Sequence, residues 1–559
     1  MESVTTDVLV VGAGAAGLRA AYEAKRHRPS LRVTLLTLGR LGRASSTDLV
    51  ASESLGINAP LDLAGDGDSP DEYLGDMLST GLGLADERLC RIVADEAADR
   101  VLELMNMGVE FDGGAHPTPK QLSGCSKARS LAAGGATGRA ITTILGRKCR
   151  ELGVEIREGW RVTGLCQEGE RVTGLQARHR RSPVLVRAKS TVLATGGAGL
   201  LFARNVNSPG AQADGWALAL NAGATLTNVE FFQIGPGVVW PPLRFIIHSG
   251  LWRLAPSLTN GLGEPFLARY CPTGTDPGDV VAAKAMSYPF SLRTPAMYLD
   301  IAMWKEIQAG RGTPNGGVYL DVGHVSPERL LSVAPVTCAA LRHAGVDLSR
   351  QPIEIAPVVQ NFTGGIAIDA DGFTGVEGLW AAGEATGGVH GADRPGGNNL
   401  TDSQVFGRRA GIAAADAAAE VPLPHGASFD ARDRYSPTAT ERRTAAALAS
   451  SCDRYLTVVR TREGLRRLLD EVEAAGETTS RVPPSTWLAH RLLVTRAIAT
   501  AALERAESRG THYREDAPTT DPRFERRLNL RMVAPQGLTA EWTRKGTDRQ
   551  DADDPAQRG

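Results

Sequence analysis

The chain has 559 residues. A single hydrophobic core stops growing at roughly 250–300 residues, so two or three domains are expected. The 62 basic and 63 acidic residues leave a net charge of -1. No long-range field then draws the protein to nucleic acid or to an anionic membrane, and the expected partner is a small molecule bound locally.

The first residues, MESVTTDVLV, lack the basic segment of a signal peptide. No run of about 18 apolar residues follows, so we expect no membrane span and a cytoplasmic protein. The seven cysteines never occur as CxxC pairs. Their spacing argues against zinc, iron–sulfur and dithiol chemistry, and we predict no metal site.

The chain opens with a strand, a glycine turn and a helix over residues 6–23, and a second strand follows over 31–38. Apolar residues near helical spacing predict a long helix over 85–111. Short β-like runs separated by turn residues predict a meander over 154–195 that returns to the main sheet. Alanine-, leucine- and arginine-rich segments from Val405 onward predict helices.

The glycine motif Gly12-x-Gly14-x-x-Gly17 lies directly between the first strand and the first helix. In this context Gly12 permits the tight turn, Gly14 lets backbone approach a pyrophosphate, and Gly17 allows close helix packing. The motif predicts a dinucleotide site, which both NAD and FAD use. At the end of the second strand, dinucleotide-binding proteins commonly have an acidic residue that binds the ribose. This chain has Thr37 and Leu38 there, so the ribose contact must come from a hydroxyl or from the backbone.

Two further glycine turns follow strands, ATGG at 194–197 and GLWAAGEA at 378–385, and both fit a long ligand laid across one sheet. The chain resembles the flavoprotein subunits of succinate dehydrogenase and fumarate reductase and L-aspartate oxidase. The likeness covers nearly the whole chain, and the segments that carry it include ATGRAITTIL, TVLATGGAG, ADGWALALNAGA, NVEFFQIGP, LTNGLGEPFLARY, GLWAAGEATGGVHGADRPGGNNL and ESRGTHYRED.

The resemblance implies an α/β fold, with a Rossmann-like FAD-binding domain, an inserted α+β capping domain and a C-terminal helical bundle. The predicted boundaries are 1–235 and 346–420 for the two parts of the FAD-binding domain, 236–345 for the capping domain, 421–535 for the helical domain and 536–559 for a disordered tail.

The resemblance also implies FAD as the cofactor. Ser46 stands about where succinate dehydrogenases carry the histidine that holds covalent flavin, so we expect non-covalent FAD. The residues expected at the cofactor are Gly12, Ala13, Gly14, Ala15, Ala16, Gly17, Thr37, Ser45, Ser46, Thr47, Val162, Ala194, Thr195, Gly196, Gly197, Asp214, Gly383, Glu384, Asn399 and Leu400.

Several substrate-binding positions of the family are changed. A histidine of the segment EFxQFHPT is replaced by Gly235, and another histidine by Gln360. A Thr-Glu pair falls on His248 and Ser249. We expect Gln360 and Ser249 to contact substrate, and His248 either takes over proton transfer or is a polar group on a loop.

Two arginines are candidates for the chemistry. Arg394, in HGADRPGGNNL, matches a family arginine and is expected to bind a carboxylate, the alternative being a structural contact with Asp393 or with a loop carbonyl. The family's proton-shuttling arginine is replaced by Gly278. Either the shuttle is lost or Arg293, fifteen residues later, takes its place.

The remaining candidates favour structural roles. Tyr288 and Tyr298 lie in the altered segment, and packing is the favoured interpretation over donation to a carbonyl or enolate. Glu507, Arg509 and His512 match a family motif that packs the helical domain on the FAD-binding domain.

The resemblance implies an FAD-dependent oxidoreductase that transfers a hydride between flavin N5 and a carboxylate-bearing substrate. The changed positions argue against plain succinate or fumarate. The expected substrate is a small carboxylic or amino acid, with oxygen or another redox partner as electron acceptor. The alternatives are an amino acid oxidase of the L-aspartate oxidase type, a flavin-binding subunit of a multi-protein electron-transfer complex, and a flavoprotein without turnover.

Overall fold

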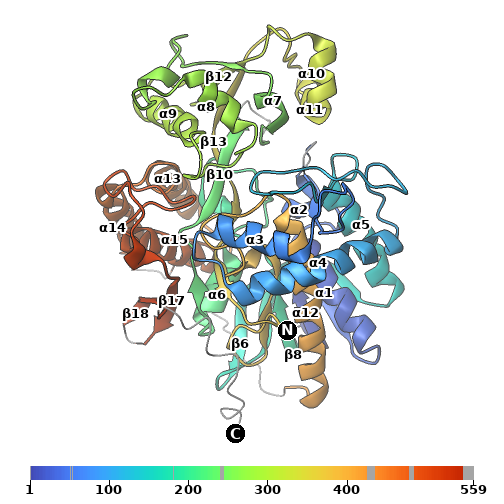
Figure 1. Cartoon of the computed structure of the whole chain (residues 1–559). Coiled ribbons are helices and arrows are strands. Elements are labelled where there is room, and N and C mark those ends of the chain that lie inside the picture. Colours follow the sequence, from blue (N-terminus) through green and yellow to red (C-terminus); the bar gives the residue numbers. More distant parts are fainter. Residues whose placement is uncertain are drawn as a thin grey trace.

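The computed structural model describes residues 2–50, 52, 55–180, 182–239, 245–247, 249–424, 435–477, 484–534 and 536–544. His248 and the segment 545–559 therefore lie outside the described residues. Figure 1 shows a main body and a smaller lobe above it.

A mixed β-sheet forms the centre of the main body. Strand β1 pairs in parallel with β2 on one side and with β8 on the other, while β6 and β7 extend the sheet as an antiparallel meander. The strands from one edge to the other are β5 (Glu155–Glu158), β2 (Val33–Thr37), β1 (Glu2–Val11), β8 (Ser182–Leu193), β7 (Arg171–His179) and β6 (Trp160–Glu168), with β15 (Leu379–Ala381) also on β8.

Both faces of this sheet are buried. Successive side chains of a strand point to opposite faces, and in β1 Val8 and Val10 join one apolar cluster while Leu9 and Val11 join another. The first cluster is covered by α1 (Ala15–His27), α3 (Pro70–Gly81), α4 (Glu87–Met107), α5 (Thr137–Glu151) and α12 (Asn398–Glu420), and the second by α6 (Asp214–Asn221) and α15 (Thr486–Glu504).

The upper lobe in Figure 1 is inserted between β10 and β13, which pair antiparallel from Phe232↔Phe362 to Val238↔Ile355. It has an apolar cluster of its own that includes Trp252, Phe266 and Leu320. Its elements are β10 (Phe232–Val238), α7 (Ser249–Trp252), β11 (Ser257–Thr259), α8 (Pro277–Lys284), α9 (Met297–Gln308), β12 (Val318–Asp321), α10 (Pro327–Val333), α11 (Pro335–His343) and β13 (Ile353–Phe362).

Smaller elements complete the body. Short strands β3 (Ile57–Asn58) and β4 (Ser130–Leu131) pair with each other. A second small sheet runs β16 (Thr386–Gly387), β14 (Gly365–Ala367), β9 (Leu226–Thr227), β17 (Leu528–Val533) and β18 (Gly537–Trp542). The other helices are α2 (Ser46–Leu49), α13 (Ala439–Tyr455) and α14 (Arg462–Glu477), with short 3₁₀ turns at Gly199–Leu201, Leu267–Arg269, Gly383–Ala385 and Pro522–Phe524.

The C-terminal region departs from the expectation of a helical bundle followed by a disordered tail. Helices α13, α14 and α15 are present, but the hairpin β17–β18 follows them and pairs with β9 of the main body. Residues 537–542 are thus a strand inside the segment predicted to be disordered. Trp542 packs against Phe524, with the two rings tilted and 5.3 Å between their centroids.

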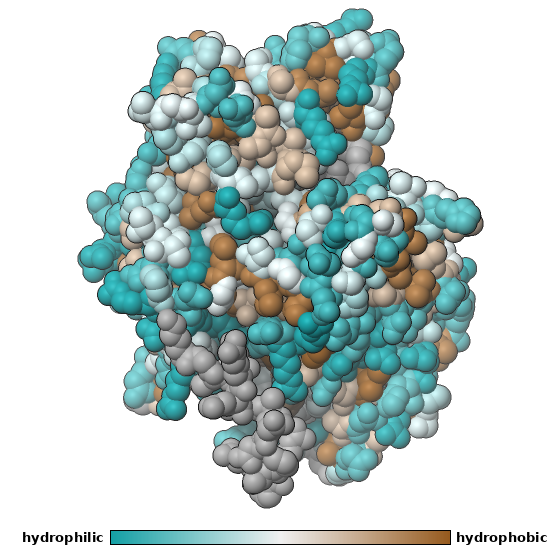
Figure 2. Space-filling view, viewed as in Figure 1, coloured by the Kyte–Doolittle hydropathy of each residue, from teal (hydrophilic) through white to brown (hydrophobic). Residues whose placement is uncertain are grey.

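The long helices predicted from the sequence are confirmed, with α4 over Glu87–Met107 and α15 over Thr486–Glu504. In the part of the chain that the structure describes, no helix combines the length and apolar character needed to cross a membrane. On the face shown in Figure 2, apolar side chains occur in small groups separated by hydrophilic ones.

Candidate functional site

A cavity of about 690 Å³ brings together the three glycine turns predicted from the sequence. Its wall includes the turns at the carboxyl ends of β1, β8 and β15, together with residues of the lobe. The predicted cofactor residues that line it are Gly12, Ala13, Gly14, Ala15, Ala16, Thr37, Ser45, Ser46, Thr47, Val162, Ala194, Thr195, Gly196, Asp214, Glu384, Asn399 and Leu400.

The first glycine turn must be built from glycine. Gly12 has a φ of +113°, and a Cβ there would stand 2.1 Å from the carbonyl oxygen of Ala194. Gly17 lies behind the wall, where a Cβ would stand 1.9 Å from the carbonyl oxygen of Gly12. Gly12 therefore allows the turn to pass the end of β8, and Gly17 allows α1 to pack on the turn.

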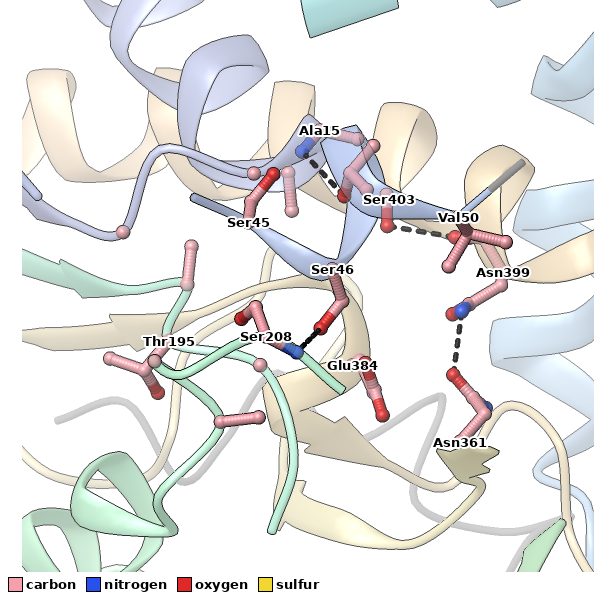
Figure 3. A pocket seen from close by; sticks show the side chains of 18 of the residues that line it. Ala15, Ser45, Ser46, Val50, Thr195, Ser208, Asn361, Glu384, Asn399 and Ser403 are labelled. Atoms are coloured by element: carbon pink, nitrogen blue, oxygen red, sulfur yellow. Dashed lines mark hydrogen bonds between the residues drawn. The ribbon is translucent and has the colours of Figure 1, made fainter. Parts of the chain in front are cut away.

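The N-terminus of α1 faces the cavity and suits an anion. Its N-cap, Gly14, contributes no side-chain cap, and the first turn carries no acidic residue. The N–H of Ala15 donates to Thr47 Oγ1 at 3.3 Å, which fixes α2 beside the turn (Figure 3). Free N–H groups and the helix dipole together stabilise a negative group such as a pyrophosphate.

The segment around Ser46 closes against the opposite wall. Ser45 and Asp48 form a capping box at the start of α2. Ser46 Oγ accepts from the N–H of Ser208 at 3.1 Å, as Figure 3 shows. Among the described lining residues there is no histidine or cysteine, and the side chain at the position of the family's covalent histidine is already engaged with backbone.

Asp214 is held in place at another part of the wall. His490 Nδ1 lies 2.9 Å from Asp214 Oδ1, and the Tyr435 hydroxyl donates to Asp214 Oδ2 at 3.3 Å. The Arg161 guanidinium donates to the same Tyr435 oxygen at 2.6 Å. These contacts join the C-terminal region to the wall of the cavity at Asp214.

Glu384 and Asn399 present polar groups to the cavity (Figure 3). Burial raises the pKa of Glu384 to about 7, against the lowering effects of the Phe362 N–H, which donates at 3.1 Å, and of the Arg394 charge. Asn399 Nδ2 donates to Asn361 Oδ1 at 2.6 Å. A carboxyl group with this pKa is poised to accept from a ligand hydroxyl near neutral pH.

Two further predicted cofactor residues lie one layer behind the wall. A Cβ on Gly197 would stand 2.8 Å from Glu384 Oε1, and one on Gly383, with φ +71°, would stand 2.7 Å from Ala16 Cβ. The structure gives these glycines a packing role, in which they let the lining residues approach one another.

The lobe side of the cavity forms a second wall, which we call the cap-side wall: Gln233, Ser249, Tyr288, Gln360 and Arg394. Gln233 pairs with Asn361 and Ile234 with Val359, so Gln360 is the extra residue of a β-bulge in β13. Bulges re-aim a side chain next to a site. Gln360 Oε1 is buried and has no hydrogen-bond partner among the described residues.

Of the two structural alternatives for Arg394, the salt bridge with Asp393 is not formed, while the contact with a loop carbonyl is present. The guanidinium of Arg394 donates to Gln233 Oε1 at 2.6 Å and to the Pro395 carbonyl at 3.2 Å. Burial lowers the pKa of Arg394 from its usual value, opposed by the Asp393 and Glu384 charges. The side chain is 7% exposed, and its buried Nε has no partner among the described residues.

Arg293 is placed beside this network and outside the lining of the cavity. Its Nε donates to Asp393 Oδ2 at 3.1 Å. Asp393 in turn accepts from the Arg394 backbone N–H at 2.8 Å and from Gln233 Nε2 at 3.2 Å. Arg293 thus fixes the carboxylate that orients two residues of the cap-side wall. His248, predicted to be catalytic, lies outside the described residues.

The motif ESRGTHYRED forms a buried charge network away from the cavity. Arg505 Nε donates to Glu230 Oε1 at 2.6 Å, and Arg509 pairs with Glu507 at 2.8 Å. Burial lowers the pKa of His512, which contacts Arg460. These groups join the C-terminal region to the start of β10, in agreement with the structural interpretation.

Sequence reasoning missed several residues of the wall. Gln233 could have been predicted from Gly235, which the sequence already marked as a substrate-binding position of the family. Residues two apart on a strand point to the same face of the sheet, so Gln233 shares that face. Arg43 and Arg161 also line the cavity, and no motif pointed to them. Their place follows from loops and sheet pairing that bring them to the cavity.

The donor set fits FAD. One cavity is lined by a helix N-terminus without a side-chain cap, by glycine turns that a Cβ would block, and by two buried polar atoms, Thr195 Oγ1 and Gln360 Oε1, that have no partner among the described residues. When bound, FAD supplies the two-electron redox chemistry, while this chain holds it and orients the substrate. Fold and cavity therefore define a dinucleotide-binding flavoprotein with an inserted capping lobe.

Comparison with known proteins makes the class more specific. The family described as FAD binding domain matches residues 7–400, and the one described as Fumarate reductase flavoprotein C-term matches 445–535. A fumarate reductase (CoM/CoB) subunit of Methanothermobacter marburgensis is 34% identical over 96% of this chain and 99% of its own length. L-aspartate oxidase of Mycobacterium leprae is 31% identical over 95% and 96%.

A solved structure, Mycobacterium smegmatis Sdh1 in complex with UQ1, superposes with a TM-score of 0.82 at 32% identity, covering 97% of this chain and 94% of that one. The chain belongs to the family of FAD-dependent oxidoreductases that contains the fumarate reductase flavoproteins and the L-aspartate oxidases. The resemblance found in the sequence is confirmed, as are the α/β fold and FAD as cofactor.

Proposed function

We propose that this oxidoreductase moves a hydride to or from the carbon next to a carboxylate, or one bond beyond it, in an acid that Arg394 anchors. The observation that carries the proposal is the environment of Arg394: its buried guanidinium lines the cavity, and its Nε has no partner in the part of the chain that the structure describes. A carboxylate there would gain a charge-assisted hydrogen bond.

The substrate of the proposal has one anchored carboxylate and is not plain succinate or fumarate. Among the described residues of the cap-side wall Arg394 is the one cation, and Gln233, Ser249, Tyr288 and Gln360 are neutral. A second carboxylate of the substrate, placed against that wall, would lose its hydration and find no cation there to compensate the cost. Gly235, in place of a histidine, also leaves no cationic group on β10.

Arg394, Ser249 and Gln360 are the proposed substrate contacts, and Arg293 is a proposed positioning residue that acts through Asp393. For proton transfer Arg293 would have to leave Asp393 and enter the cavity. His248 remains a candidate for that step on the sequence argument alone. FAD is proposed to be non-covalent, which the engaged Ser46 and the absence of histidine and cysteine among the described lining residues support.

A second candidate is an amino acid oxidase, favoured by the 31% identity to L-aspartate oxidase over nearly the whole chain. A third is a component that passes electrons to a partner chain, which is supported by the fumarate reductase relative being named as one subunit of its enzyme. Co-purification of a stoichiometric iron–sulfur protein would establish the third. The cytoplasmic location stays a prediction.

Anaerobic titration of the FAD-loaded protein tests the proposal. Monocarboxylic, dicarboxylic and amino acids are added while the flavin absorbance is followed, and the reduced protein is then mixed with oxygen. We expect monocarboxylates to perturb or reduce the flavin more strongly than succinate, fumarate or aspartate. If no acid changes the spectrum, the proposed function is wrong, whereas reduction by aspartate alone would establish the oxidase.

A further inference from the structure

Arg293 is a cation that the chain holds in a fixed place beside the cap-side wall. It lies between α8 and α9, where the Phe290 N–H donates to the Ile234 carbonyl at 2.6 Å and the Leu292 N–H donates to the Gly510 carbonyl at 2.9 Å. Phe290 is also fully buried in the second apolar cluster of the main body. The segment that carries Arg293 is thus attached to the main body, although it belongs to the inserted lobe.

Asp393 accepts three hydrogen bonds, and one of them comes from Arg293. Its Oδ2 accepts from Arg293 Nε at 3.1 Å, while its Oδ1 accepts from the Arg394 backbone N–H at 2.8 Å and from Gln233 Nε2 at 3.2 Å. The Asp393 side chain is 3% exposed, so water cannot readily replace a lost donor. The carboxylate is therefore neutralised by Arg293 and not by the guanidinium of Arg394.

Asp393 also decides how the amide of Gln233 is turned. An ionised carboxylate can only accept hydrogen bonds, so the NH₂ group of Gln233 must face Asp393. The amide oxygen then faces Arg394, from which it accepts at 2.6 Å. Gln233 is buried and carries no charge, so it holds the guanidinium without neutralising it. The chain thus orients Arg394 with a neutral group.

The charge that Arg394 offers to a ligand depends on what neutralises Asp393. Burial lowers the pKa of Arg394, and the charge of Asp393 opposes this lowering more than the charges of Glu384 and Asp402 do. A buried carboxylate without a partner is costly, so removal of Arg293 would leave Asp393 to pair with Arg394. An acid would then have to compete with Asp393 for the same guanidinium.

We propose that Arg293 and Asp393 are positioning residues that reserve the charge of Arg394 for the substrate: Arg293 neutralises Asp393, and Asp393 orients Gln233, which holds the guanidinium. The proposal rests on the proposed function and adds to it the selection of an ionised acid over a neutral compound of the same shape. Arg293 and Asp393 lie outside the lining of the cavity and act through Arg394.

The test measures the binding of two matched probes, pentanoate and pentanamide, to FAD-loaded protein by anaerobic flavin titration. Wild-type protein is expected to bind pentanoate more tightly than the neutral amide. Arg293→Ala should reduce this preference by roughly fivefold or more, as expected for charges coupled in one network, because Asp393 then turns to Arg394. Arg293→Met keeps a long side chain without the charge and should have the same effect, which separates the charge of Arg293 from its packing.

Asp393→Asn removes the negative charge that Arg293 neutralises. The asparagine oxygen can still accept from the Arg394 N–H and from Gln233, so the guanidinium stays oriented. Combined with Arg293→Ala, this change should restore the preference for pentanoate that Arg293→Ala loses. If Arg293 served packing alone, the double variant would be no better than Arg293→Ala. Arg253→Ala with Asp279→Asn makes the same change of charges on the exposed surface of the lobe and is the matched control.

The outcomes separate the two proposals. If Arg394→Ala loses acid binding while Arg293→Ala and Arg293→Met keep the wild-type preference, the role of Arg293 and Asp393 is wrong and the proposed function stands. A double variant that is no better than Arg293→Ala, or equal affinity of the wild type for the two probes, also overturns this role. If neither probe nor any other acid perturbs the flavin, the proposed function itself fails, and the role of Arg293 and Asp393 fails with it.

Discussion

Replacing Arg394 by alanine tests the anchor on which the function depends. The guanidinium is 7% exposed, its Nε is unpartnered among the described residues, and the rest of the described cap-side wall is neutral. Truncating one partner of a buried charge pair costs roughly 2–5 kcal/mol. At about 1.4 kcal/mol for each factor of ten, acid affinity should fall by roughly 30- to 4,000-fold.

The same change also affects folding, and the assay must separate the two effects. Gln233 Oε1 loses its donor at 2.6 Å, which costs roughly 1–3 kcal/mol of unfolding free energy. FAD content and thermal unfolding are therefore measured beside the flavin titration. Arg394→Lys keeps the charge but not the planar donor geometry, and it should recover only part of the affinity.

Arg253→Ala is the matched control, because it removes the same charge from the exposed surface of the lobe, outside the cavity. It should leave acid affinity unchanged. An Arg394→Ala protein that keeps its FAD and binds acids like the wild type would refute the anchor and leave Arg394 with a structural role.

The remaining predictions concern the cofactor and Arg293. A flavin hydroxyl that donates to Glu384 favours its carboxylate form, so FAD affinity should fall by up to about tenfold per unit as pH drops below about 7. Quenching of flavin fluorescence measures this, and Glu384→Gln should flatten the profile; an equal slope in that variant would assign it to another group. Acid precipitation should release FAD into the supernatant, and yellow colour retained in the pellet would show a covalent bond. Arg293→Ala should keep FAD but weaken acid binding severalfold, because Asp393 loses its partner at 3.1 Å. Arg293→Lys should restore most of that binding. Lost turnover with unchanged acid affinity would instead make Arg293 the proton shuttle.

The cofactor half of the site could be predicted because its determinants are local. Gly12, Gly14 and Gly17 are fixed by the spacing of a strand, a turn and a helix, and Glu384 lies in the turn that follows β15. Residues that are close together in the sequence determine local geometry of this kind. The cavity indeed brings Gly12, Gly14 and Glu384 together, with Gly17 packed behind them.

The substrate half depends on contacts between distant segments, and the sequence alone left its alternatives open. Tyr288 was assigned to packing because nothing near it in the chain reveals Gly235 beneath its ring. Gln360 gains its direction from a bulge that exists only when β13 pairs with β10. The C-terminal hairpin likewise forms because β17 finds β9 as a partner.

The sequence by itself determined the family, the fold and the cofactor, since the motif segments that carry the family resemblance are continuous stretches of the chain. The tertiary structure alone decided that Arg394 donates to Gln233 and not to Asp393, that Arg293 supports the wall from behind, and that Tyr288 fills the space at Gly235. These outcomes depend on which side chains meet across β10, the lobe and the loop before α12. Such distances are set by packing and not by spacing along the chain.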